Sequence, residues 1–143
     1  MNIDFESSFR RIDALIGEED DPAKAAAIWL RHLRANLELP CDVTGVDDFR
    51  WEEPYVLGVG DAREYRRLCR RQPSYLDVFT LERIEADAAD SEWPLHQDDL
   101  GARVIRKSDS RPFVLGLSEL KAVDHERNEQ LLHDYSIWLA NYR

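Results

Sequence analysis

Six carboxylates and no Lys or Arg occupy the window from Ile84 to Ala102. The six are Glu85, Asp87, Asp90, Glu92, Asp98 and Asp99. Carboxylates at this density repel one another, so they require full solvation, a bound cation or a basic partner surface. Blocks of like charge are most often simply solvated. A cation site is the more specific interpretation.

A second acidic group lies between residues 47 and 53, where Arg50 is the only cation. Its carboxylates are Asp47, Asp48, Glu52 and Glu53. Ca²⁺ takes about six to eight oxygen ligands from carboxylates, backbone carbonyls and waters, and loops beside neighbouring strands can gather them. Neither acidic group has the spacing of an EF-hand loop.

Length and composition fit one folded domain over residues 1–143, because a chain of this size with 43% hydrophobic residues can bury a core. The formal net charge of −10 opposes binding to nucleic acid, whose affinity depends on Lys and Arg. The two cysteines, Cys41 and Cys69, have no metal-ligand spacing. The sequence pattern predicts neither a signal peptide nor a membrane span. We therefore expect a soluble cytoplasmic protein with no nucleic-acid or membrane partner.

No catalytic motif is present in the sequence. The patterns GxGxxG, GxxxxGK[ST], HExxH and GxSxG are all missing. Gly58-Val59-Gly60 lacks a third glycine and predicts a turn rather than a phosphate-binding loop. We therefore expect no enzymatic activity.

Hydrophobic periodicity predicts an α+β fold with helices at both ends of the chain. The expected helices cover residues 2–16, 21–37, 61–71 and 125–142. The expected strands cover residues 41–46, 55–58, 77–85, 103–107 and 112–117, with an edge strand or turn at 118–123. The architecture is a small, mostly antiparallel sheet or open barrel with N-terminal helices and a C-terminal amphipathic helix.

Two stripes of the expected helices have predicted roles. The apolar stripes of the second and last helices predict a shared core, made of Trp29, Leu33, Tyr135, Trp138 and Leu139. The helix at 61–71 carries a basic stripe of Arg63, Arg66, Arg67, Arg70 and Arg71. We expect these arginines to act mainly as counter-charges for one of the acidic groups.

The C-terminal half resembles a known family. The segments that carry the resemblance are 99–104, 112–124 and 132–141, which read DLGARV, PFVLGLSELKAVD and LHDYSIWLAN. They are similar to the cyanobacterial CcbP-type family of small acidic cytosolic calcium-binding proteins. The resemblance extends weakly to Trp29-Leu30, Leu33 and Leu39-Pro40-Cys41, and it covers roughly residues 25 to 50 and 76 to 143.

This resemblance implies a Ca²⁺ site made by acids of both groups. The positions that correspond to acidic segments of the family are Asp47, Asp48, Glu52, Glu53, Asp98 and Asp99. The implied function is a small acidic calcium-binding protein, either a buffer or a sensor. The alternative is an acidic immunity-type or inhibitor protein that covers the basic surface of a partner protein.

Overall fold

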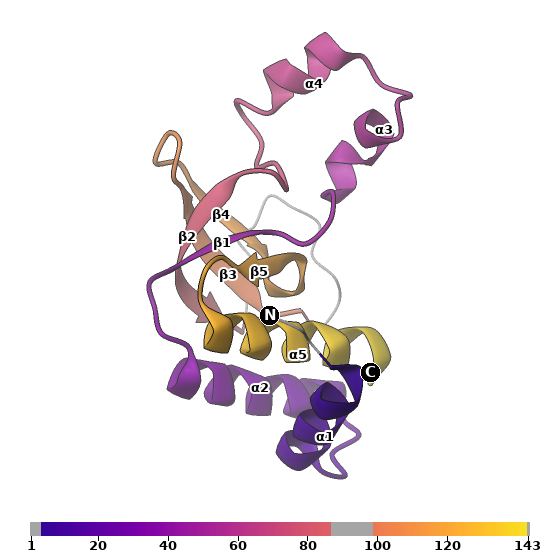
Figure 1. Cartoon of the computed structure of the whole chain (residues 1–143), viewed down its shortest axis with the longest axis vertical. Helices are drawn as coiled ribbons and strands as arrows, with labels where there is room; N and C mark the ends of the chain where they lie inside the picture. Colours follow the sequence, from indigo (N-terminus) through magenta and orange to yellow (C-terminus); the bar gives the residue numbers. More distant parts are fainter. Residues whose placement is uncertain (1–3, 87–98, 143) are drawn as a thin grey trace.

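A computed structural model describes residues 4–86 and 99–142 of the chain. Within these residues there are five α-helices, two 3-10 helices and five strands (Figure 1). In chain order they are α1 (Phe5–Ile16), α2 (Pro22–Asn36), β1 (Cys41–Gly45), η1 (Arg50–Glu52), α3 (Glu53–Val56), α4 (Ala62–Leu68), β2 (Val78–Glu85), β3 (Gly101–Arg106), β4 (Pro112–Gly116), η2 (Leu117–Glu119), β5 (Leu120–Ala122) and α5 (Glu126–Asn141).

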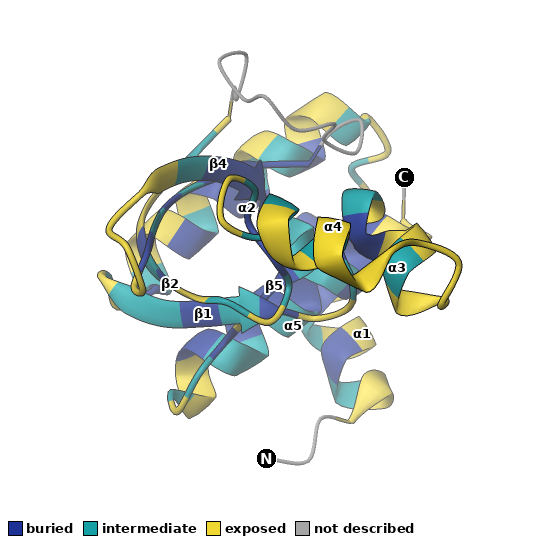
Figure 2. Ribbon diagram, turned by 90° about the horizontal axis from the view of Figure 1, so that it is seen from above, coloured by how far each residue is buried: buried dark blue, intermediate teal, exposed yellow. Residues whose placement is uncertain are grey.

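The five strands form one antiparallel sheet in the order β4-β3-β2-β1-β5. This arrangement confirms the predicted α+β class. The edge strands β4 and β5 are joined by η2 alone, so four peptide steps connect Gly116 to Leu120. Four steps span at most about 14 Å, whereas the edges of a flat five-stranded sheet lie about 19 Å apart. The sheet must therefore curl, and Figure 2 shows its strands bending round toward one another.

Three helices cover one end of the curled sheet (Figure 1). Helix α5 packs against β5 and η2, α1 packs against α5 and α2, and α2 also contacts β2. The start of α2 is fixed locally, because the Asp21 carboxylate accepts a hydrogen bond from Ala23 N at 3.0 Å and Pro22 occupies the first turn. No helix in the described part of the chain combines the length and apolar character that a bilayer span needs.

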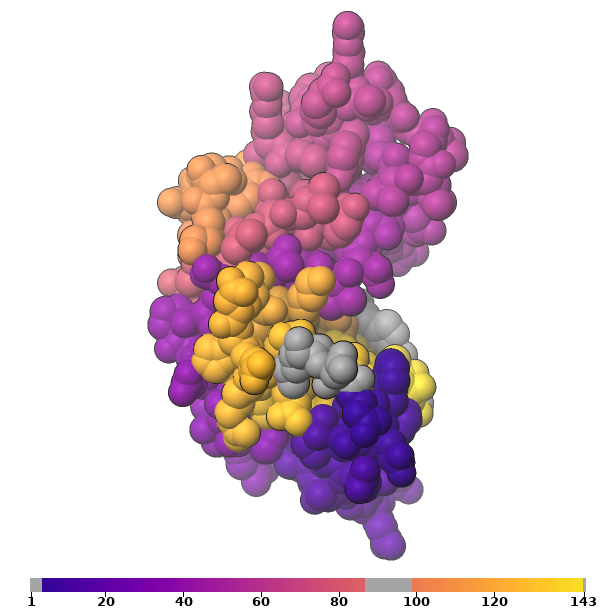
Figure 3. Space-filling view, viewed as in Figure 1, coloured from indigo at the N-terminus to yellow at the C-terminus, as the bar shows by residue number. Residues whose placement is uncertain are grey.

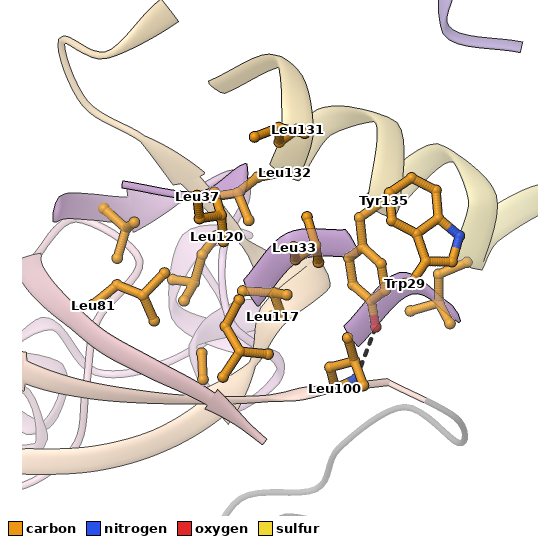
Figure 4. Close-up of a cluster of buried hydrophobic side chains, with 14 of the residues drawn as sticks. Trp29, Leu33, Leu37, Leu81, Leu100, Leu117, Leu120, Leu131, Leu132 and Tyr135 are labelled. Carbon is orange, nitrogen blue, oxygen red and sulfur yellow. Dashed lines mark hydrogen bonds between the residues drawn. The ribbon is translucent and has the colours of Figure 1, made fainter. Parts of the chain in front are cut away.

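The predicted core is confirmed. Its five residues Trp29, Leu33, Tyr135, Trp138 and Leu139 are each at most 3% exposed, and Figure 4 shows Leu33 and Tyr135 beside leucines of the sheet and of η2. The ring of Trp29 lies 5.6 Å from that of Tyr135 and 6.0 Å from that of Trp138. The two Trp-bearing stripes therefore meet in one aromatic cluster.

The structure corrects one expected element. Residues 55–58 were predicted as a strand, but Tyr55 and Val56 belong to the short helix α3. Pro54 occupies the first turn of α3, where proline is well tolerated. The Tyr55 ring stacks on that of Tyr65 at 5.2 Å, so tertiary packing decides the conformation of this apolar run. The other predicted helices and strands are confirmed with shifts of a few residues at their ends, apart from residues 2 and 3, which lie outside the described residues.

Residues 50–73, which we call the basic lobe, project from the sheet at the end opposite α1 (Figures 1 and 3). The lobe contains η1, α3 and α4. The predicted counter-charge role of its arginines stays a prediction, because residues 87–98 of the acidic window lie outside the described residues. The side chains of Arg63, Arg66, Arg67, Arg70 and Arg71 are exposed and form no ion pair with any residue in 4–86 or 99–142.

Candidate metal site

Asp99 is a buried carboxylate two residues before β3, with 8% of its surface exposed. Its Oδ1 accepts hydrogen bonds from the Tyr135 hydroxyl at 2.7 Å and from Ser118 N at 3.2 Å, and its Oδ2 accepts one from the Ser118 hydroxyl at 2.7 Å. The Tyr135 oxygen in turn accepts a hydrogen bond from Leu100 N at 2.7 Å (Figure 4). Side chains of η2 and α5 therefore fix the orientation of Asp99.

Glu119 brings a second carboxylate to the same place. It ends η2, just beyond the strand-ending Gly116, and is half-buried. A Cβ on Gly116 would lie 2.5 Å from Asp99 Oδ2 and 3.5 Å from Glu119 Oε2. The two oxygens thus converge on one point of the backbone, and a side chain at position 116 would collide with the Asp99 carboxylate. We call these two residues the Asp99–Glu119 pair.

The pair perturbs the ionisation of Glu119. Burial, and then the negative charge of Asp99, raise the pKa of Glu119 from 4.5 to about 7. Both causes act against the charged carboxylate, because it has lost part of its hydration and faces a like charge. A cation bound between the two groups would remove the repulsion and favour the ionised form.

The raised pKa predicts that Glu119 makes stability depend on pH. A carboxyl with a higher pKa in the folded protein than its ordinary 4.5 binds its proton more tightly when folded. Its contribution to the free energy of unfolding is therefore complete below about pH 4.5 and is lost as the pH rises through about 7. In thermal unfolding with a chelator present, we expect wild type to lose stability relative to Glu119→Gln across this range. Parallel pH profiles for the two proteins would contradict the assignment.

The structure places the acids of the first loop elsewhere. Asp47 and Glu53 are exposed and Asp48 is half-buried. None of them joins the Asp99–Glu119 pair in a group of three potential metal ligands within residues 4–86 and 99–142. Of the second predicted set, Asp99 is in the pair, and Asp98 lies outside the described residues.

Glu52 is fully buried at the base of the basic lobe, and its carboxylate is surrounded by hydrogen-bond donors. Oε2 accepts hydrogen bonds from the Tyr65 and Ser74 hydroxyls, both at 2.6 Å, and Oε1 accepts one from Tyr75 N at 2.7 Å and a longer one from Phe49 N at 3.4 Å. Each oxygen of Glu52 thus accepts two hydrogen bonds at a fully buried position, and these satisfy its charge. In the structure Glu52 therefore fastens the lobe to the sheet, which is a different role from the ligand that the sequence predicted.

Sequence reasoning missed Glu119. It stands in Ser118-Glu119-Leu120-Lys121, next to a cation and outside both acidic groups. The one signal that points to it is Gly116, because a glycine in an apolar strand often marks a close approach of another group. Here that group is the carboxylate of Asp99.

The pair can supply carboxylate oxygens to a hard cation, but it does not complete a coordination shell. Ca²⁺ needs about six to eight oxygens, some of which can be backbone carbonyls and waters. The free thiols of Cys41 and Cys69 are both half-buried, and burial raises the pKa of each. A thiol held protonated is a poor ligand and a poor nucleophile, so neither cysteine competes with the carboxylate oxygens for a metal ion.

No protein family model matches the sequence, and no curated protein matches it either. Two solved structures have a similar fold. The crystal structure of Anabaena CcbP is 18% identical in sequence, with a TM-score of 0.58 over 98% of this chain and 94% of that chain. A calcium-binding protein in its calcium-binding form is 17% identical, with a TM-score of 0.60 over 96% of this chain and 94% of that chain. The fold implied by the sequence resemblance is therefore confirmed.

Proposed function

We propose that this chain is a non-catalytic, cytoplasmic Ca²⁺-binding protein whose site is centred on the Asp99–Glu119 pair. The observation that carries the proposal is the convergence of Asp99 Oδ2 and Glu119 Oε2 on Gly116. Two partly dehydrated carboxylates beside the same glycine repel each other, and a cation bound between them would remove this repulsion. The likeness in fold to a protein described in a calcium-binding form supports the choice of Ca²⁺.

The chemistry of the site favours Ca²⁺ over Mg²⁺. The ligand atoms are carboxylate oxygens on an irregular turn, η2, and just before a strand. Ca²⁺ accepts variable geometry and ligand number, whereas Mg²⁺ requires a compact octahedron. Asp98 remains a predicted further ligand, and backbone carbonyls and waters would complete the shell. Without an EF-hand loop we expect a dissociation constant of about 10⁻⁵ to 10⁻³ M.

Isothermal calorimetry tests this proposal. We expect Ca²⁺ to bind wild type, Glu119→Gln to weaken binding at least about 10-fold, and the double variant Asp99→Asn/Glu119→Gln to abolish it, because each change removes a ligand charge. Glu119→Gln is the cleaner variant, since Asp99 also has structural hydrogen bonds. Circular dichroism at the titration temperature checks that each variant is folded.

The matched control is Asp47→Asn/Asp48→Asn, which removes the same charge from the first acidic loop. If the Asp99–Glu119 pair is the site, this variant binds Ca²⁺ like wild type. Loss of binding in this variant alone would move the site to the loop. No heat from wild type at millimolar Ca²⁺ would remove the metal function and favour the acidic protein that covers a basic partner surface.

A further inference from the structure

The basic lobe reverses the charge of the molecule locally. Residues 50–73 contain six arginines and four acids, which gives a net charge of +2. The whole chain carries −10, so the remaining residues carry −12. One of the four acids, Glu52, is fully buried beneath the lobe. The exposed part of the lobe is therefore more basic than its composition indicates.

The arginines of the lobe are exposed on the surface of the molecule. Arg63, Arg66, Arg67 and Arg70 recur at the spacing of one helical stripe, and each is exposed. No carboxylate of residues 4–86 or 99–142 forms an ion pair with them. Seen from above, α4 presents an exposed face at the end of the molecule (Figure 2).

The turn that precedes α4 is apolar and equally exposed. Leu57 is 70% exposed and Val59 is 83% exposed, and Val56 beside them is 47% exposed. Gly58 and Gly60 flank Val59, and Gly58 has a φ of 82°, a conformation that glycine adopts without strain. Large apolar side chains gathered on a projecting turn mark a contact surface.

Buried polar contacts hold this projection in place. Glu52 binds Tyr65 and Ser74, and Trp51 Nε1 donates to Pro73 O at 2.7 Å. On the other side the buried Arg106 guanidinium donates to the backbone carbonyls of Cys69, Arg70 and Gln72, each at 2.9 Å. An apolar turn and a basic helix are thus presented together on a fixed support.

We propose, in place of the sequence-based expectation of no membrane partner, that the basic lobe docks peripherally onto an anionic lipid bilayer. Leu57 and Val59 would enter the interface, and the α4 arginines would contact phosphate groups. Apolar side chains beside basic ones are the combination that binds such surfaces. The lobe is a convex protrusion (Figure 3), which suits a soft, extended surface. The phosphates of a nucleic acid would bind the arginines but would not bury the apolar side chains of the turn. The acidic rest of the protein lies on the far side of the lobe from the bilayer. Salt screens its repulsion by the anionic lipid at distances beyond about 8 Å.

Vesicle co-sedimentation tests this inference. The probes are phosphatidylcholine vesicles with and without phosphatidylserine, in the presence of a chelator so that Ca²⁺ cannot bridge carboxylates to lipid. We expect wild type to bind only the phosphatidylserine vesicles, and to dissociate as salt rises. Arg63→Gln/Arg66→Gln/Arg67→Gln should weaken binding at least about 10-fold, and Leu57→Ser/Val59→Ser several-fold.

The matched control removes three exposed cations far from the lobe, Arg10→Gln/Lys24→Gln/Arg31→Gln, and should bind vesicles like wild type. If this control loses as much vesicle binding as the triple arginine variant of α4, net charge alone explains the effect and the inference is overturned. Unchanged binding in Leu57→Ser/Val59→Ser, stronger binding to an oligonucleotide than to vesicles, or no binding to phosphatidylserine would also overturn it. These outcomes do not bear on the Ca²⁺ site, because the lobe and the Asp99–Glu119 pair share no residue.

Discussion

Replacing Glu52 by Gln is expected to lower the free energy of unfolding of the basic lobe by about 2–4 kcal/mol, because hydrogen bonds to a buried charge are among the strongest in a protein. Three short hydrogen bonds, from Tyr65, Ser74 and Tyr75, end on the Glu52 carboxylate. An amide offers one oxygen instead of two and presents an N–H group to a site built of donors. The lobe loses the contact that fastens it to the sheet.

Hydrogen exchange of the amides of α3 and α4 measures this change directly, since local opening exposes them. The matched control is Glu53→Gln, the same substitution on the next residue, whose side chain is exposed. A surface change of this kind should stay within about 0.5 kcal/mol of wild type. Equal exchange in the two variants would contradict the anchoring role of Glu52.

A second observable is the ionisation of Tyr65. Burial and the hydrogen bond to Glu52 raise the pKa of the Tyr65 phenol above its ordinary value of 10. Removing the charge of Glu52 should bring this pKa down, and the absorbance of tyrosinate reports the shift. The same variant should bind Ca²⁺ like wild type. If Glu52→Gln loses Ca²⁺ binding while the lobe stays folded, Glu52 is a Ca²⁺ ligand as the sequence predicted.

The elements that the sequence predicts well are those whose limits are set by neighbouring residues. Asp21 and Pro22 define the start of α2 within one turn, and the structure shows the expected cap. The helix at 125–142 has an apolar stripe long enough to identify the period, and it becomes α5. Errors arise in short segments. Residues 55–58 contain too few positions to separate helix from strand, and the Tyr55–Tyr65 contact decides between them.

The site is less predictable, because it depends on how the sheet closes. Asp99 and Glu119 are separated by 20 positions and become neighbours only when the curl of the sheet brings the start of β3 to η2. Local charge density selected acids that the fold treats differently. Glu52 and Glu53 are adjacent and chemically identical in the sequence. In the structure Glu52 is buried and surrounded by hydrogen-bond donors, whereas Glu53 is exposed. Whether a particular carboxylate is buried depends on the tertiary structure, so the local sequence does not predict it.

Trp138→Ala is expected to lower the global free energy of unfolding by about 3–5 kcal/mol, which would be among the largest effects of any substitution in this chain. The Trp138 side chain is 1% exposed and contacts the rings of Trp29, at 6.0 Å, and Tyr135, at 5.8 Å. Truncation leaves a cavity between α2 and α5 that the two remaining rings cannot fill. Urea unfolding followed by circular dichroism measures the loss.

The control is Tyr142→Ala on the next turn of the chain, where the ring is 38% exposed and the cost should stay below about 1 kcal/mol. If Trp138→Ala fails to fold, Trp138→Phe keeps an aromatic ring and should cost about 1–3 kcal/mol. If Trp138→Phe unfolds at the same urea midpoint as wild type, the predicted contribution of Trp138 to the stability of the core is wrong.

The aromatic cluster also connects the core to the candidate site, because the Tyr135 ring packs on Trp138 while its hydroxyl donates to Asp99 at 2.7 Å. Trp138→Phe should leave Tyr135 in place and preserve Ca²⁺ binding. A folded Trp138→Ala protein should bind Ca²⁺ more weakly, since Tyr135 loses a packing partner and Asp99 is held less firmly. Equal Ca²⁺ affinity in both variants would show that packing of Tyr135 on Trp138 does not position Asp99.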